Sequence, residues 1–299
     1  MAPDKSPTST PIPMMVKTAP KRKDPDALEV RILSGITEFD AAARLIGHVF
    51  SPDGVSHVPA DLTVAVSLAG GYVGGAFIDN ELIGVAIAFG EIRPWQHPRE
   101  APTSSLAMHS HVAAVASKAR GRRVGWSLKM HQREWALARG VDTIDWTFDP
   151  LERRNGFFNM TLLGAQAIQY LPNLYGEIDD DVNRKQETDR VLVRWNLNSP
   201  EAIIAASGTL VEPAITDAEM KKSALWPSDR APSAPQVFSG AQQMRQLCGT
   251  PTDIEALAKT DLAAALSWRR AQRAILQPAL DSGAVITGMT RSGWYTLER

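Results

Sequence analysis

Cysteine is almost absent from this chain of 299 residues, which contains a single one, Cys248. One cysteine excludes an intramolecular disulfide, and it excludes zinc sites built from several cysteines. Such usage is typical of a reducing compartment. We expect Cys248 to be a buried structural thiol.

Long hydrophobic runs and an excess of one charge are missing as well. No segment approaches the ~18 to 20 continuous apolar residues of a membrane span, and the N-terminus has no apolar signal core. The 32 Lys and Arg residues nearly balance the 33 Asp and Glu residues, so no overall field attracts nucleic acid or a membrane surface. The sequence predicts a cytoplasmic protein with no nucleic-acid or membrane partner, in which any anion site is local.

Composition divides the chain into three parts. Residues 1–27 are rich in Pro, Ser, Thr and Lys without apolar periodicity, which predicts a disordered leader and favours a solvated tail over a targeting patch. Residues 28–198 carry regular strand and helix patterns. Residues 199–299 form an extension that is partly irregular, then helical over 253–280, with closing strands at 285–290 and 294–297. This apolar extension either covers one edge of a sheet or forms a homodimer contact.

The order of elements in residues 28–198 predicts the fold class. We expect strands at 30–32, 70–78, 82–89, 106–115, 143–149, 167–170 and 190–197, helices at 36–50, 124–139 and 151–163, and a hairpin turn at 79–80. In the helix at 124–139, Lys129, Arg133 and Arg139 lie away from the apolar stripe. The strand at 143–149 alternates, which predicts one covered and one polar face. The order indicates an α+β protein built around a mixed sheet.

One segment between a strand and a helix is suited to anion binding, namely Arg120-Gly121-Arg122-Arg123-Val124-Gly125-Trp126. The first turn of a helix has N–H groups without intrahelical partners and about half a positive charge, so phosphates bind there. Gly121 and Gly125 let the backbone approach a ligand, and the arginines add charge and directed donors. The alternative is an ordinary basic loop that caps a helix.

This segment resembles the acyl-CoA signature of the GNAT superfamily of N-acetyltransferases, Arg/Gln-x-x-Gly-x-Gly/Ala. Arg120 and Gly125 match its first and last places, while Arg123 stands where the family usually has glycine. The resemblance runs over about residues 30–197. It extends to a subgroup of predicted GNAT acetyltransferases with a C-terminal extension, through segments 108–115, 146–150, 155–164, 173–176, 188–190 and 265–273.

The resemblance implies a GNAT-like mixed, mostly antiparallel sheet flanked by helices, and acetyl-CoA or another acyl-CoA as co-substrate. It implies that backbone groups around Ala113 to Val115 pair with the pantetheine arm and that the turn from Arg120 to Trp126 holds the pyrophosphate. Asn155 matches a family position that often touches the cofactor.

Acyl transfer to an amine needs a base and a group that protonates the leaving thiolate. His109 and His111 share a strand face at i and i+2, and His111 is the first candidate for the base; hydrogen-bonded core histidines are the alternative. A metal pair is not favoured, because no third ligand follows by spacing. Glu91, at the end of a strand, is a second candidate base or a solvated strand end.

The family's tyrosine acid is missing, since the corresponding place four residues before Gly164 is Met160. Tyr175 replaces it as a proton donor, or is simply a packed loop tyrosine. Asp149 orients a histidine or begins the turn at Pro150, and we favour the turn.

The basic and aromatic segment at 268–273 can be interpreted in two ways. It is typical of nucleic-acid binding, but no basic face elsewhere in the sequence matches it, so a solvated helix face with Trp268 packed inward is favoured.

These observations favour an acyltransferase that moves an acetyl or other acyl group from acyl-CoA to an amine or hydroxyl of a small-molecule acceptor. An acyl-CoA-binding protein without transferase activity, and an acyl-CoA lyase or decarboxylase, are the alternatives, because a fold does not determine the chemistry. The acceptor pocket is expected from the loops near 51–68, 91–105 and 177–187.

Overall fold

A computed structural model of the chain describes residues 28–51, 54–91, 106–176, 187–216, 224–225 and 245–299. The predicted leader at 1–27, and most of the loops expected at 91–105 and 177–187, lie outside the described residues.

The first half of the sheet is an antiparallel array followed by one parallel strand. It consists of β1 (Glu29–Ile32), β2 (Tyr72–Ile78), β3 (Glu81–Glu91) and β4 (Leu106–Val115), with β5 (Val141–Phe148) parallel to β4. The β2–β3 connection is the predicted turn: Asp79 and Asn80 both have positive φ, of 50° and 62°, as a tight hairpin turn requires.

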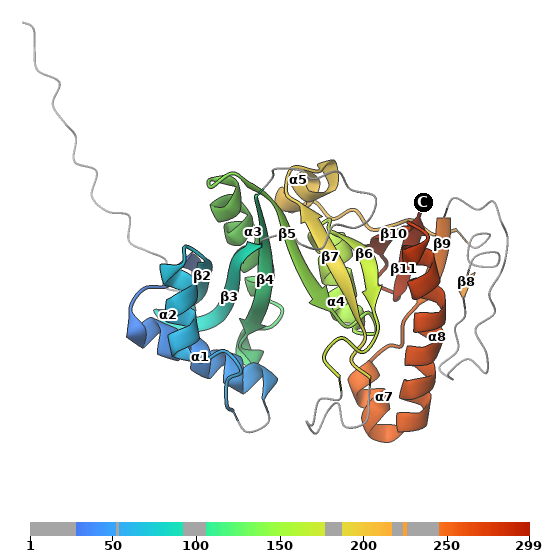
Figure 1. The fold of residues 1–299 in the computed structure, drawn as a ribbon, viewed down its shortest axis with the longest axis horizontal. Helices are drawn as coiled ribbons and strands as arrows, with labels where there is room; N and C mark the ends of the chain where they lie inside the picture. Colours follow the sequence, from blue (N-terminus) through green and yellow to red (C-terminus); the bar gives the residue numbers. More distant parts are fainter. Residues whose placement is uncertain (1–27, 52–53, 92–105, 177–186, 217–223, 226–244) are drawn as a thin grey trace, which may run out of the picture.

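The second half continues the same sheet into the C-terminal extension. Its strands are β6 (Gln166–Leu171), β7 (Arg190–Asn196), β8 (Ala224–Leu225), β9 (Arg245–Gly249), β10 (Val285–Met289) and β11 (Trp294–Glu298). The eleven-stranded order is β1-β2-β3-β4-β5-β7-β6-β10-β11-β9-β8, and β10 joins the extension to β6 (Figure 1). The predicted α+β architecture, a mixed and mostly antiparallel sheet flanked by helices with a C-terminal helix and strand extension, is therefore confirmed, and the extension covers an edge of the sheet.

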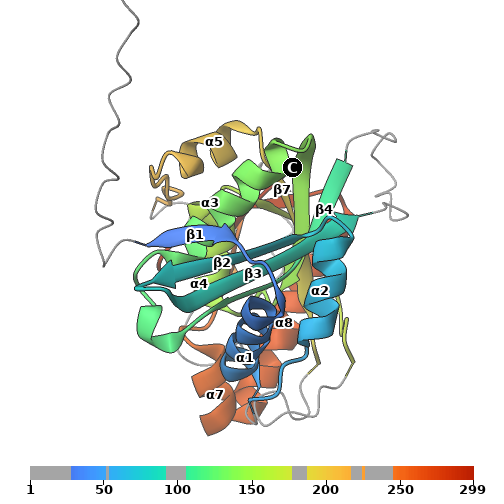
Figure 2. The same cartoon turned by 90° about the vertical axis from the view of Figure 1, so that its left-hand side faces the viewer.

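Helices cover both faces of the sheet. α1 (Ile36–Phe50) and α2 (Ala60–Leu68) lie on one side of β1 to β3, and α3 (Val124–Leu137) lies on the other (Figure 2). Each side has its own cluster of buried apolar residues. The other α-helices in the described part of the chain are α4 (Arg153–Phe157), α5 (Pro200–Ala206), α7 (Ile254–Thr260) and α8 (Leu262–Asp281).

Two predicted helices are interrupted. The helix expected at 253–280 is divided at Asp261, whose φ of −149° ends α7 and whose side chain caps the first turn of α8 by accepting from Ala264 N–H at 2.9 Å. The helix expected at 151–163 is α4 followed by a π-helical turn at Phe158–Leu162. In that turn, Thr161 Oγ1 donates to Met289 O at 2.6 Å and accepts from Met289 N–H at 3.1 Å, so the turn is tied to β10.

Two predictions of exposure are wrong. Lys129 was expected on the polar side of its helix, but its side chain is buried, with 4% of its surface exposed. Thr143 and Asp145 were expected on a polar face, but both are buried, because β5 is an interior strand between β4 and β7 with both faces covered. Asp145 is neutralised by Arg194, whose Nη2 donates to its carboxylate at 2.9 Å.

Arg269 and Arg273 in the basic segment of α8 bind carboxylates elsewhere in the fold, whereas Arg270 is exposed. Trp268 is buried as expected, but Arg269 is buried too and donates to both carboxylate oxygens of Asp149 at 2.9 and 2.7 Å. Arg273 binds Asp189 and Glu187. Asp149 also accepts from Leu151 N–H at 2.9 Å, so it begins the turn at Pro150, and none of its partners among the described residues is a histidine. The predicted solvated face is wrong for Arg269 and Arg273.

Cys248 is buried as predicted, and burial raises the pKa of its thiol to about 12. None of the helices in the described part of the chain combines the length and apolarity that crossing a membrane requires. Within the same residues, no group of three or more His, Cys, Asp or Glu side chains is placed to hold a metal ion.

Candidate functional site

The candidate site begins where two parallel strands diverge. Pairing between β4 and β5 ends at His109 and Asp145, although β4 continues to Val115 and β5 to Phe148. A β-bulge in β4 marks this point: Ala88 faces Ser110 and Ile87 faces Val112, so His111 is the extra residue. Because a bulge bends its strand and increases local twist, it accounts for the separation of β4 from β5. Beyond it, β4 presents a backbone edge that β5 does not pair.

The two candidate base residues gather beside this bulge. The rings of His109 and His111 lie 6.3 Å apart, and their centroids are 5.4 and 5.9 Å from that of Phe89 on β3. His111 is exposed and His109 is half-buried. Burial, reinforced by the neighbouring His111, lowers the pKa of His109, although Asp145 acts in the opposite direction. A neutral imidazole at this place is able to accept a proton.

Glu91 ends β3 two residues beyond Phe89, and therefore on the same face of that strand. It is half-buried, so it is not the fully solvated strand end of the alternative interpretation. The structure thus brings His109, His111 and Phe89 together, with Glu91 on the same side of the sheet.

The predicted anion-binding turn lies at the end of β4. A short 3-10 turn at Ser117–Ala119 leads to Gly121, with φ of 82°, and α3 begins at Val124 with no side chain capping its N-terminus. Arg120, Gly121, Arg122 and Arg123 are all exposed. The first turn of α3 therefore has free N–H groups directed at a surface rich in positive charge.

Arg123 explains how the chain departs from the family signature. Its backbone is left-handed, with φ of 60° and ψ of 14°, which is the conformation that glycine adopts most easily. The backbone shape expected of glycine is thus retained, at a conformational cost of about 1 kcal/mol. The guanidinium lies 4.3 Å from the centroid of the Trp126 ring, so this side chain is stacked on α3.

Space for a ligand remains at the start of α3. A Cβ built on Gly125 would meet no atom closer than 3.8 Å, and its nearest neighbours are the Phe158 ring and Val115 Cγ2. Protein packing alone therefore does not require glycine here, which fits a position that a ligand approaches. Ala113 is exposed and Val115 half-buried, so the end of β4 borders the same space.

Three further predicted residues lie around the divergent strands. Asn155 is exposed on α4, and its Oδ1 accepts from Asn159 Nδ2 at 3.1 Å. Met160 is buried in the π-helical turn and offers no proton. Tyr175 is not a packed loop residue, because 57% of its surface is exposed; its hydroxyl lies 3.2 Å from Thr147 Oγ1, on the part of β5 that β4 does not pair.

Sequence reasoning missed a polar cluster on the α3 side of the divergence. Lys129 Nζ donates to Ser110 Oγ at 2.7 Å and to Gln132 Oε1 at 3.1 Å, and it lies 4.1 Å from the centroid of the Trp146 ring. Burial lowers the pKa of Lys129 to about 7. The sequence contained a pattern that predicts this burial. Four residues spaced at i, i+4, i+7 and i+11 form one stripe of the helix that faces the sheet, namely Gly125, Lys129, Gln132 and Ala136.

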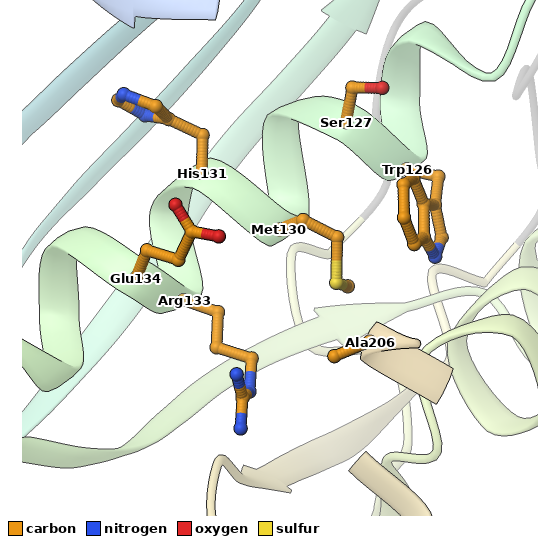
Figure 3. Close-up of a pocket in the computed structure, with 7 residues that line it drawn as sticks. All are labelled: Trp126, Ser127, Met130, His131, Arg133, Glu134 and Ala206. Carbon is orange, nitrogen blue, oxygen red and sulfur yellow. The ribbon is translucent and has the colours of Figure 1, made fainter. Parts of the chain in front are cut away.

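A separate pocket of about 270 Å³ lies on the opposite surface of α3. Figure 3 shows its lining side chains, which come from α3 and α5: Trp126, Ser127, Met130, His131, Arg133, Glu134 and Ala206. His131 Nδ1 lies 2.9 Å from the hydroxyl of the buried Tyr72. The pocket is lined by α3 residues other than Gly125, Lys129, Gln132 and Ala136, which face the sheet. It is therefore distinct from the opening between β4 and β5.

No family model matches the sequence, and no curated protein matches it. Solved structures with similarity include the ribosomal-protein-S18-alanine N-acetyltransferase from Escherichia coli, at 12% identity and a TM-score of 0.44, covering 64% of this chain and 98% of that one. An N-acetyltransferase from Staphylococcus aureus is 16% identical with a TM-score of 0.44, covering 57% and 99%. An N-acyl amino acid synthase from uncultured soil microbes is 14% identical with a TM-score of 0.44, covering 60% and 97%. Similarity at this level carries no conclusion about activity or substrate, and the architecture stands on the strand order described above.

Proposed function

We propose that the chain binds an acyl-CoA between β4 and β5 and transfers the acyl group to an amine or hydroxyl of a small-molecule acceptor. The observation that carries this proposal is the juxtaposition of an unpaired β4 edge with the uncapped, arginine-rich N-terminus of α3. A ligand with amides along one part and a pyrophosphate at the other end matches both features. The acyl-CoA-binding domain is residues 28–198, and a cytoplasmic location stays a prediction.

The backbone of Ala113 to Val115 would hydrogen-bond the amides of the pantetheine arm, as a neighbouring strand does. Arg120 and Arg122, which are exposed, would bind the pyrophosphate together with the first N–H groups of α3. Gly125 leaves room for the ligand, and Asn155 is exposed on the neighbouring α4. The residues present therefore fit an acyl-CoA.

His111 and His109 would remove the proton from the attacking nitrogen or oxygen. Both rings lie beside the bulge where β4 leaves β5, which is the position at which the thioester end of the ligand would stop. Glu91 is a second group on that face, suited to attracting a cationic amine.

Thermal unfolding with acetyl-CoA, CoA and desulfo-CoA tests binding. A ligand at about 100 times its dissociation constant stabilises the folded state by about 2.7 kcal/mol, which is a visible shift in Tm. We expect this shift in the wild type and its loss in Arg120→Ala/Arg122→Ala. The charge-matched control, Arg44→Ala/Arg139→Ala, removes two exposed arginines elsewhere and should keep the shift. An unchanged Tm of the wild type with all three ligands contradicts the proposal.

An acyl-CoA-binding protein without transferase activity is the second candidate, and the buried Met160 in place of a proton donor favours it. Release of free thiol from acetyl-CoA across an acceptor screen decides between the two. Transfer predicts acceptor-dependent release that is lost in His111→Ala, whereas a binding protein releases no thiol with any acceptor.

A further inference from the structure

Lys129 is a buried cation without an acidic partner. Its side chain touches a hydroxyl, an amide oxygen and an aromatic face, and it forms no ion pair within the described ranges. Burying an unpaired ammonium is unfavourable, and proteins usually avoid it. Gln132, also buried, leaves its Nε2 without a hydrogen-bond partner among the described residues. Two such groups in contact are characteristic of functional sites rather than of structural cores.

The cluster lies at the point where β4 and β5 part. Ser110 directly follows His109, the last β4 residue paired with β5, and Trp146 directly follows Asp145, its partner. Lys129 bridges these two positions from the α3 side. The histidine rings lie on the other face, with Phe89, whose strand neighbours Val85 and Ile87 pack toward α1. Where β4 and β5 separate, the imidazoles of His109 and His111 therefore lie on one face of the sheet, and the ammonium of Lys129 lies on the other.

We propose that Lys129, acting through Ser110 Oγ, supplies the proton for the sulfur that leaves when the acyl group is transferred. This inference rests on the proposed function and assigns the acid that Met160 does not provide. Ser110 would be the catalytic residue in contact with the sulfur, and Lys129 the group that keeps Ser110 able to donate.

The proton transfers balance. The attacking nitrogen forms a bond to the carbonyl carbon, and the bond from that carbon to sulfur breaks. The proton lost by nitrogen goes to His111 or His109. The proton gained by sulfur comes from Ser110 Oγ, and Lys129 Nζ replaces it, so the ammonium becomes an amine. The histidine then loses its proton to solvent, and Lys129 regains one from water through Ser110 Oγ after the thiol product has left.

The acidity of Lys129 suits this role. Its pKa of about 7 lies below the value of about 8.5 typical of a free thiol, so proton transfer to a thiolate is favourable near neutral pH. The face of Trp146 favours the ammonium and keeps the charged form accessible. The other titratable groups nearby are His109 and His111 of β4 and Asp145 of β5, and Arg194 neutralises Asp145.

The experiment measures the ultraviolet absorbance of the CoA thiolate on binding to the enzyme between pH 6 and 9, with desulfo-CoA as the ligand that has no thiol. At pH 6, where Lys129 carries its proton, a bound thiol beside it should form about tenfold more thiolate than free CoA, and this gain should shrink as Lys129 loses its charge above pH 7. This readout needs neither acceptor nor turnover. Affinity for desulfo-CoA reports the CoA site alone.

Lys129→Met keeps the side-chain volume and removes the charge; it should lose the tenfold thiolate gain and bind desulfo-CoA as the wild type does. Gln132→Glu keeps the lysine but pairs it with a carboxylate, and it should lose most of the gain as well. Lys118→Met, which removes an exposed lysine paired with Glu81, should change nothing.

The outcomes separate the two proposals. If wild type and Lys129→Met bind both ligands and form equal amounts of thiolate, the role of Lys129 is overturned and the acyl-CoA site stands. If the wild type binds neither ligand, the proposed function fails and the role of Lys129 fails with it.

Discussion

Two regions of the molecule bury basic side chains, and they do so in opposite ways. In the extension, Arg269 and Arg273 of α8 each meet a carboxylate, Asp149 and Asp189, so the charges are paired and the helix is attached to β5 and β7. At the divergence of β4 and β5, the groups that Lys129 contacts among the described residues are all uncharged. A paired buried cation holds elements together, whereas an unpaired one makes the protein less stable and is retained for another reason.

The carboxylates show the same pairing. Burial alone would raise the pKa of Asp189, but hydrogen bonds from Arg273, Tyr170 and the Asn173 N–H outweigh that effect and hold the pKa below its usual value. Asp189 therefore stays ionised, and the pair with Arg273 remains charged at every physiological pH.

The largest change in stability is expected for Arg269→Met, which removes the ion pair between α8 and Asp149. This change leaves Asp149 partly buried with only Arg190 nearby, 3.8 Å away, and should destabilise the fold by about 3 to 5 kcal/mol. Urea unfolding at pH 7 measures the effect. The control is the exposed neighbour Arg270→Met, which should cost under about 0.5 kcal/mol. A loss as small as the control's would show that the ion pair does not hold the extension.

Lys129→Met should change the free energy of unfolding in the opposite direction, because it removes an unpaired buried charge. The pKa of Lys129 is about 7 in the folded protein and about 10.5 when unfolded, so the unfolded state binds more protons between these values. Wild-type stability should therefore rise by about 4 kcal/mol from pH 7 to pH 10.5, and this rise should be absent in Lys129→Met. At pH 7 the variant should be more stable than the wild type, as urea unfolding across that pH range would show.

Glu152 precedes α4 and lies near Glu255 and Asp253 of the extension, and its partly buried carboxyl is not compensated by the arginines. Burial, with Glu255, Asp149 and Asp253 adding, raises its pKa to about 7, although Arg269 acts in the opposite direction. The stability contributed by this group is present below pH 4.5 and is lost as pH rises through 7. Glu152→Gln should gain about 2 kcal/mol at pH 8, after allowance for partial solvent screening, and nothing at pH 4. An equal gain at both pH values would point to packing instead of charge.

The smallest expected effect concerns the backbone of the turn that precedes α3. Arg123 is left-handed, so Arg123→Gly should be more stable than Arg123→Ala by about 1 kcal/mol, because alanine retains the Cβ that this conformation disfavours. The two variants differ by one methyl group and lose the same charge. Equal stability would mean that the turn relaxes to another conformation once the Trp126 stacking is removed.

Much of the fold follows from local patterns in the sequence. The turn at Asp79 and Asn80, the strand at 106–115 and the helix beginning at Val124 were all predictable, because turn residues and apolar periodicity act over a few positions. The turn between β4 and α3 followed for the same reason. The site near the bulge was only partly predictable: His109 and His111 were found, but Ser110 and Lys129 were not.

The failures have one physical cause. Lys129 looks like a surface residue because lysine is seldom buried, and only the contacts with Ser110 and Trp146, from two other elements, show otherwise. Arg269 was misjudged in the same way, since its partner Asp149 is far away in the chain. Long-range neighbours decide whether a charged side chain is buried, and a single sequence does not give them.

The continuous sheet has a consequence for how this chain is made. β6 acquires its outer neighbour, β10, only after residues 285–289 have left the ribosome, and synthesis proceeds at about 5 to 20 residues per second. Until then, the edge of β6 is an open template for another strand. The extension therefore protects this edge only late in synthesis. A chain that ends before β10 would leave β6 free to pair with a strand of another copy of the chain.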